Sequence, residues 1–187
     1  MEITEILQEA ESSMIKSYEF TKSQIEKIRT GGASANLVDG IDVDAYGAKT
    51  PLNQVAGIST PDARTIMIQP YDNGLLQEIE RAIQIADLGF NPQNDGNVIR
   101  IPVPPLTEER RMEYVKVCKN YAEEGRIAVR NARRNAIDQL RNAEKEKEIS
   151  EDIQKDGEND TQSITDKYIE KIDAVLEEKE KELIGND

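Results

Sequence analysis

The sequence concentrates basic side chains on one predicted helix, where together they could bind an anionic ligand. Between Arg110 and Arg134 the sequence holds eight basic residues against three acids, a local charge of +5 in a chain of net charge −13. At about 100° per residue, the helical period, seven basic residues of this helix fall in a sector about 100° wide, which Glu123 shares as the one acid. This row, here called the basic stripe, consists of Lys116, Lys119, Arg126, Arg130, Arg133, Arg134 and Arg141.

The chemistry available to such a stripe is recognition of phosphate. The planar fork of arginine suits phosphate better than the point charge of lysine does. A focused basic surface on an acidic protein favours one nucleic-acid docking face over general attraction to polyanions. The alternative is an ordinary solvated face, but the stripe lacks the interleaved acids that normally neutralise one. We therefore expect the stripe to bind nucleic acid.

Groups that could carry catalysis or hold a metal are scarce. The chain has no histidine and one cysteine, Cys118, which excludes a histidine general base, a Cys-His dyad and a structural zinc site. No glycine-rich phosphate loop is present. Asp42–Gly47 faintly resembles a calcium loop, but Tyr46 stands where an Asp or Asn is needed, and Asn53 replaces the closing Glu. We expect no enzyme and no cofactor.

Three helices should position the stripe, over residues 2–29, 106–147 and 151–183. Thr107 and Ser150 are the expected N-caps of the second and third helices. Gly157 should weaken the third by about 1 kcal/mol relative to alanine. The second helix carries small apolar residues at steps of four and three, so a neighbouring helix should approach closely and leave no room for larger side chains at Ala132 or Ala136. This seam consists of Cys118, Ala122, Gly125, Val129, Ala132 and Ala136.

The middle of the chain, residues 31–104, follows a different pattern and carries a net charge of −5 from four basic and nine acidic residues. Short β-branched runs bounded by turn residues predict strands, and the helical spacing of residues 75–88 predicts one helix. The expected strands are Leu37–Tyr46, Val55–Ser59, Arg64–Tyr71 and Val98–Val103.

The expected fold class is therefore α+β. A long three-helix bundle, residues 1–30 and 105–187, should carry an inserted small α/β domain, residues 31–104. Two stretches of chain must cross between them, and they should form a hinge. The hinge residues are Thr30, Gly31, Gly32, Pro104 and Pro105.

Short motifs in a fixed order also give this chain a resemblance to a known family. They are KIRTG at Lys27–Gly31, LVDG at Leu37–Gly40, Tyr46–Gly47, DLG at Asp87–Gly89, Asn91–Pro92, IRIP at Ile99–Pro102, PPLTEERR at Pro104–Arg111, VRNARR at Val129–Arg134, SED at Ser150–Asp152 and Thr165–Asp166. In this order and spacing the chain resembles the ribosome recycling factor family over essentially its whole length.

The resemblance implies an L-shaped protein that performs no covalent chemistry. Such a factor binds the ribosome after termination and, with elongation factor G and GTP, promotes subunit dissociation and the release of mRNA and tRNA. Its bundle lies against large-subunit rRNA. Family arginines matching Arg29, Arg111, Arg130 and Arg133 are the implied RNA contacts, and the stripe adds Lys119, Arg126 and Arg134 as candidates.

Three positions depart from the usual family pattern. Gly32 stands where arginine is common, Ala35 where proline is common, and Asn135 where aspartate is common. The missing arginine puts one RNA contact near the hinge in doubt. The missing proline, together with Gly32, should make this hinge strand more mobile.

Partners and compartment follow as expectations. One cysteine, no apolar run of about 20 residues and an acidic amphipathic N-terminus indicate a soluble intracellular protein. We expect a cytoplasmic monomer, or a mature protein of an organelle stroma or matrix, that binds neither membrane nor DNA. Two alternatives stay open: a bundle scaffold or holdase for an acidic protein partner, and a carboxylate-dependent hydrolase, although the acids of residues 144–187 look solvated.

Overall fold

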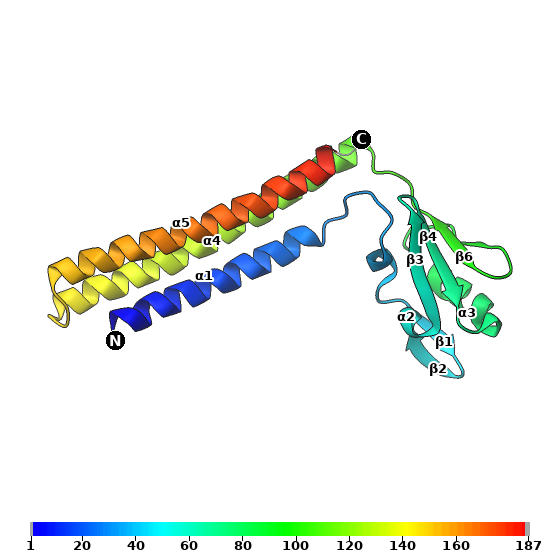
Figure 1. Ribbon diagram of the computed structural model, residues 1–187, viewed down its shortest axis with the longest axis horizontal. Coiled ribbons are helices and arrows are strands. Elements are labelled where there is room, and N and C mark those ends of the chain that lie inside the picture. Colours follow the sequence, from blue (N-terminus) through cyan, green and yellow to red (C-terminus); the bar gives the residue numbers. More distant parts are fainter. Residues whose placement is uncertain (1, 186–187) are drawn as a thin grey trace. The chain divides into compact units, whose positions relative to one another are not determined.

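The computed structural model describes residues 2–185 and has an α+β fold (Figure 1). The chain divides into two compact units. The first combines Met1–Thr30 with Thr107–Asp187, and the second comprises Gly31–Leu106. The first unit is a bundle of long helices and the second holds all the strands of the described residues, so the predicted fold class is confirmed.

The bundle consists of α1 (Ile3–Glu26), α4 (Glu108–Lys145) and α5 (Glu151–Ile184). Each lies within three residues of its predicted bounds. With 38 residues, α4 extends about 57 Å at 1.5 Å per residue. No helix among residues 2–185 is long and apolar enough to cross a membrane.

Capping side chains fix where the two longest helices begin, as predicted. The Thr107 hydroxyl accepts the backbone N–H of Arg110 at 3.2 Å, and the Ser150 hydroxyl accepts that of Ile153 at 3.2 Å. The C-terminal end of α1 is stabilised by another helix. The last turn of α1 has no basic residue of its own. Buried Lys179 of α5 donates instead to the carbonyl oxygen of Glu26 at 3.3 Å. A cation at this position also opposes the negative end of the helix dipole.

All six residues of the predicted seam are buried, so its helical phase is confirmed. The closest approach is at Gly125, where an added Cβ would lie 2.3 Å from the Thr21 hydroxyl oxygen of α1. Ala132 and Ala136 are buried, and both also border an open hollow of about 150 Å³ between α1 and α4. That no larger side chain fits at these two positions stays a prediction.

Gly157 also has a packing role that its helix propensity did not suggest. A Cβ there would lie 2.9 Å from Leu140 Cδ2, and Leu140 is fully buried in α4. Glycine therefore lets α5 approach α4 closely, and the helix-propensity cost expected from the sequence is offset by this packing.

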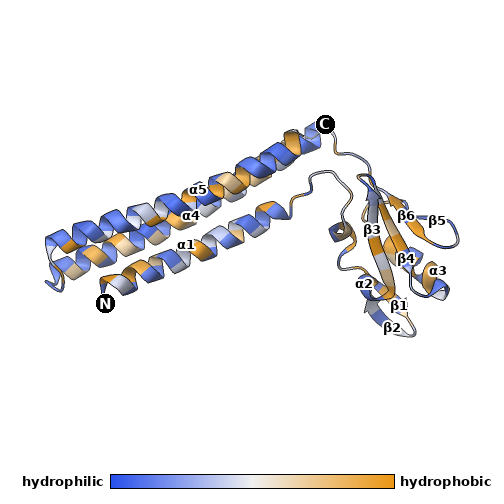
Figure 2. Ribbon diagram, viewed as in Figure 1, coloured by the Kyte–Doolittle hydropathy of each residue, from blue (hydrophilic) through white to orange (hydrophobic). Residues whose placement is uncertain are grey.

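The small domain is built around one apolar core. An antiparallel sheet in the order β3-β4-β6-β5 is formed by β3 (Ala56–Asp62), β4 (Thr65–Pro70), β6 (Ile99–Pro102) and β5 (Gln93–Asn94). In its centre Ile66 pairs with Ile101 and Ile68 with Ile99, and all four side chains are fully buried. Figure 2 shows apolar residues concentrated on these strands, whereas the long helices are largely hydrophilic with apolar bands.

Helical turns and a hairpin complete this domain. They are η1 (Ala35–Val38), β1 (Asp42–Ala45), β2 (Ala48–Pro51), α2 (Leu52–Val55), η2 (Asn73–Leu75) and α3 (Leu76–Ile85). The predicted helix and three of the four predicted strands are confirmed, as α3, β3, β4 and β6. The strand predicted over Leu37–Tyr46 is wrong in its first half, where the Ser34 side chain caps the 3-10 turn η1. The strands β2 and β5 were not predicted.

The two connecting segments are held at one place on the small domain. The Ala33 N–H donates to the Ala63 carbonyl at 2.8 Å, and the Val103 N–H donates to the Arg64 carbonyl at 2.7 Å. Both segments are therefore tied to the same β3–β4 turn. Gly31 has a φ of +98°, and a Cβ there would lie 3.2 Å from Leu106 Cγ. Proline fixes φ near −65°, so it does not fit at Gly31.

Candidate RNA-binding face

The basic stripe lies on the side of α4 opposite the part of the seam that meets α1, and the structure divides it into two rows. The paired row contacts α5 through side chains and consists of Lys119, Arg126, Arg133 and Arg141. The open row has no hydrogen bond or ion pair with α5 in the described part of the chain and consists of Lys116, Arg130 and Arg134. The two rows have different chemical roles.

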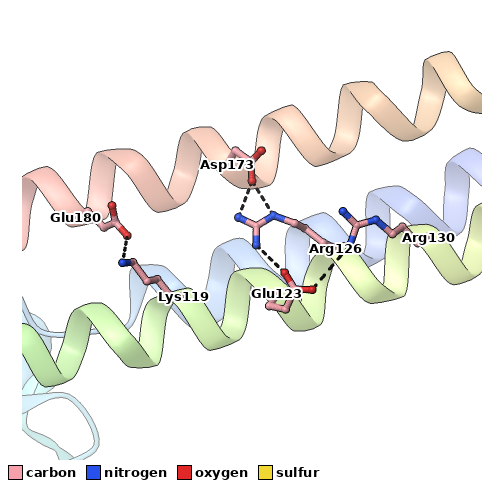
Figure 3. A network of polar contacts seen from close by, with 6 residues as sticks. All are labelled: Lys119, Glu123, Arg126, Arg130, Asp173 and Glu180. Carbon is pink, nitrogen blue, oxygen red and sulfur yellow. Dashed lines mark hydrogen bonds and ion pairs between the residues drawn. The ribbon is translucent and has the colours of Figure 1, made fainter.

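The paired row joins α4 to α5 through side chains spaced in heptads. Lys119 Nζ lies 4.0 Å from Glu180 Oε1, and Arg126 NH2 lies 2.7 Å from Asp173 Oδ1 (Figure 3). Each seven-residue step forward along α4 is thus matched by seven residues backward along α5. This is the interhelical charge pairing of antiparallel coiled-coil helices.

The same register continues toward the far end of the bundle. Arg133 Nε donates to Gln162 Oε1 at 2.7 Å, and Gln162 Nε2 donates to Asp166 Oδ1 at 2.8 Å. Eight residues after Arg133, Arg141 Nε lies 2.9 Å from Glu158 Oε1. An amide thus stands between Arg133 and the nearest acid, so Arg133 is not neutralised by a direct ion pair at this point.

Two expectations about charge are therefore corrected. The acids of α5 are not simply solvated, since Glu158, Asp173 and Glu180 pair with the stripe. The stripe also has neutralising acids: these three come from α5, and Glu123 of α4 itself pairs with Arg126. The sequence of α4 alone does not reveal the acids of α5. The matching seven-residue spacing of Lys119, Arg126 and Arg133 with Asp166, Asp173 and Glu180 was the available signal.

Arg126 is the most constrained cation of the stripe. Its Nε and NH2 both contact Asp173 Oδ1, at 2.8 and 2.7 Å, and its NH1 lies 3.0 Å from Glu123 Oε2. The side chain is 20% exposed. Partial burial acts to lower the pKa of Arg126, but hydrogen bonds to Asp173 and Glu123 outweigh it and raise the pKa overall. Arg126 thus stays charged and holds a fixed direction.

The open row presents cations to solvent. Arg130 is 53% exposed, and its NH1 lies 3.8 Å from Glu123 Oε1, a long contact. Lys116 and Arg134 are exposed and have no ion pair within residues 2–185. Apolar Ile127, 48% exposed, lies between them on the same side of α4. These side chains can bind phosphate without first giving up a strong internal partner.

The remaining predicted contacts, Arg29 and Arg111, are not part of this group. Both are half-buried; Arg29 follows the end of α1, and Arg111 lies in the first turn of α4. Arg111 and Arg133 are 22 residues apart, roughly 33 Å along the helix axis. The predicted site residues therefore form two separate groups on the bundle.

The described residues offer little for covalent chemistry. Cys118 is fully buried, and burial raises the pKa of its thiol, which keeps the thiol protonated at neutral pH. The α5 acids nearest the stripe each face a cation or an amide on α4 and do not converge on a cleft. The bundle and its stripe define a helical protein with a basic surface along α4.

Comparison with known proteins identifies one family whose sequences match this chain. A sequence model of the family described as "Ribosome recycling factor" matches residues 21–184. A ribosome-recycling factor of Nostoc punctiforme is 52% identical over 178 residues, covering 95% of this chain and 98% of that protein. Its counterpart in Prochlorococcus marinus subsp. pastoris is 54% identical over 177 residues, with 95% and 97% covered.

Two solved structures extend the likeness to the fold. A solution structure of a ribosome recycling factor has a TM-score of 0.74 and 42% identity, covering 100% of this chain and 99% of that one. A T. thermophilus ribosome recycling factor, described with E. coli elongation factor G bound to the E. coli post-termination complex, has a TM-score of 0.62 and 45% identity, with 99% and 100% covered.

The chain belongs to the ribosome recycling factor family. Members of this family are not enzymes. The functional site of such a protein is a binding surface and not a catalytic centre.

Proposed function

We propose that this chain recycles ribosomes. It binds the post-termination ribosome and, with elongation factor G and GTP, promotes dissociation of the subunits and release of mRNA and tRNA. The observation that carries this proposal is the open row of cations on an otherwise acidic protein of this family. The T. thermophilus relative described on the post-termination complex with elongation factor G supports both partners.

We propose large-subunit rRNA as the ligand of the stripe. Phosphate reaches Arg130 and Arg134 most readily, because neither has a short internal ion pair among the described residues. Arg133 contributes the nitrogens that its bond to Gln162 leaves available. Lys119 and Arg126 also fix α5 against α4 through Glu180 and Asp173. Arg29 and Arg111 would form a second contact near the start of α4.

The small domain is proposed to move relative to the bundle during this cycle. Its two connections, Thr30–Gly32 and Pro104–Pro105, would absorb the movement. Both connecting segments are tied to the β3–β4 turn, so bending would concentrate between that turn and the helix ends. We further propose that the protein acts in the cytoplasm as a monomer, without DNA, membrane or cofactor.

A splitting assay tests the function directly. Post-termination ribosomes would be incubated with this protein, elongation factor G and GTP, and the subunits separated on sucrose gradients. Free subunits should appear only when all three are present, and a GTP analogue that resists hydrolysis should abolish splitting. Intact ribosomes in the complete reaction would reject the proposal and favour a scaffold that binds an acidic protein.

A further inference from the structure

Glu123 lies inside the basic stripe and bridges two arginines (Figure 3). Its Oε2 lies 3.0 Å from Arg126 NH1, and its Oε1 lies 3.8 Å from Arg130 NH1. The Glu123 side chain is 55% exposed, so it can turn into solvent without breaking the core. A carboxylate shared by two guanidinium groups occupies the kind of position that a phosphate takes between two arginines.

We propose that Arg126 and Arg130 form a phosphate subsite for RNA, and that Glu123 fills this subsite in the free protein. The inference rests on the proposed function and deepens it. An incoming RNA phosphate displaces the carboxylate and takes over both guanidinium groups. Glu123 thereby sets how tightly the protein holds the ribosome and how quickly it leaves.

Arg126 makes this subsite more than a chance surface contact. Asp173 engages its Nε and NH2, which leaves NH1 as the nitrogen directed at the subsite. A side chain that is already held in place loses little conformational entropy when it binds phosphate. The entropy cost of binding is therefore lower than for a freely rotating arginine. Arg130, with its longer contact and greater exposure, is free to close over the phosphate.

Glu123 opposes RNA binding in two ways. Its charge repels phosphate at close range, and its contacts with Arg126 and Arg130 must be given up before phosphate can bind. Replacing it with glutamine keeps the shape and removes the charge. Near a screened surface, we expect Glu123→Gln to tighten binding about three- to tenfold and to slow dissociation by a similar factor.

The adjacent acid supplies a matched control. Glu124 is also exposed and also lies on α4, but it lines the groove between α1 and α4 on the other side of the helix. Glu124→Gln changes the net charge of the protein by the same amount as Glu123→Gln. It should leave binding within about twofold of wild type, because only position 123 faces Arg126 and Arg130.

The experiment measures equilibrium affinity and dissociation rate for purified bacterial large ribosomal subunits, using wild type, Glu123→Gln and Glu124→Gln at several salt concentrations. Tighter binding and slower release in Glu123→Gln alone support the subsite. Equal effects of the two variants would overturn it, because they would report net charge only. Unchanged or weaker binding in Glu123→Gln would also overturn it, since Glu123 would then be neutral or a support for Arg130.

Two further measurements keep the outcome clear. Helical circular dichroism and the thermal midpoint should match wild type in both variants, because Asp173 still holds Arg126. Wild-type protein that fails to bind large subunits would reject the proposed function itself. Wild-type binding without a difference between positions 123 and 124 would reject only the phosphate subsite.

Discussion

Gly125 of α4 faces Thr21 of α1 with no room for a methyl group between them. A Cβ at Gly125 would lie 2.3 Å from Thr21 Oγ1 and 2.9 Å from its Cγ2. Thr21 is itself buried, with 3% of its surface exposed. This contact brings α1 close to α4 in the middle of the bundle, on the other side of α4 from the open row. The helix that carries the stripe is therefore positioned partly by a single glycine.

Gly125→Ala should destabilise the bundle, although alanine is the better helix former by about 1 kcal/mol. Overpacking of a tight core contact costs about 1–3 kcal/mol, and it should outweigh that gain. Thermal or urea unfolding followed by circular dichroism measures the change.

Two variants sharpen this test. Thr21→Ala removes the two closest atoms, so combining it with Gly125→Ala should recover much of the lost stability. Asn131→Ala, an exposed change on the same helix, should have little effect. If Gly125→Ala is as stable as wild type, α1 and α4 are not held this closely in solution.

Gly32 offers space that Gly31 does not. It is exposed, and a Cβ there would come no closer than 4.0 Å to the Ala63 carbonyl oxygen. Gly32→Arg should therefore fold normally, add one cation near the hinge and tighten binding to large subunits about threefold or more. It should also narrow the distribution of distances between spin labels placed in the two domains, because glycine's backbone freedom is lost.

Gly32→Ala separates these two effects. It removes the backbone freedom without adding charge, so the distance distribution should narrow while affinity stays near wild type. Equal tightening by Gly32→Ala and Gly32→Arg would show that charge at this position is irrelevant. A distribution that neither variant changes would mean that position 32 does not control the hinge.

Asp95 makes part of the small domain's stability depend on pH. Its carboxylate accepts the N–H groups of Val98 and Asn97, at 2.9 and 3.0 Å, and contacts Arg100 at 2.5 Å. These contacts lower the pKa of Asp95 from 3.8 to about 2. The hydrogen bond from the Val98 N–H has the largest effect, followed by those from Asn97 and Arg100. Because the folded pKa is the lower one, the stabilisation is complete above about pH 4 and is lost as pH falls toward 2.

Asp95→Asn should therefore lower the urea midpoint of the small domain at pH 7, and the gap from wild type should shrink below pH 4. NMR signals of β6 follow this domain separately, and the Asp95 carboxyl signal should titrate near pH 2. Asp42→Asn, which removes a negative charge elsewhere in the same domain, controls for net charge. A carboxyl signal that titrates near 3.8 would rule out this network.

Much of the bundle could be predicted because local signals dominate there. The seam from Cys118 to Ala136 has one helical phase, and Thr107 and Ser150 mark helix starts by their own side chains. The small domain was harder. Ala48–Pro51 and Gln93–Asn94 become strands through pairing with a neighbouring strand, not through β-branched composition.

The same difference holds for the basic stripe. Which residues share one face of α4 follows from the period of a single helix, so the members of the stripe could be predicted from the sequence. Whether each cation is available depends on α5, which approaches in a register that no residue of α4 reveals. Arg126 and Arg130 look equivalent in the sequence, yet one is held by Asp173 and the other is half exposed.

Docking of the α4 stripe on large-subunit rRNA is tested by two double variants that remove the same charge from different helices. Each phosphate contact by an arginine contributes about 1.5–3 kcal/mol. Arg133→Ala combined with Arg134→Ala should therefore weaken binding to purified large subunits at least about tenfold, and should flatten the dependence of affinity on salt.

Lys155→Ala combined with Lys181→Ala removes the same charge from exposed positions of α5 and should bind like wild type. Both double variants should keep wild-type helicity. Only the Arg133→Ala, Arg134→Ala variant should lose affinity for the large subunit. Equal affinity of the two double variants for the large subunit would contradict docking through the stripe.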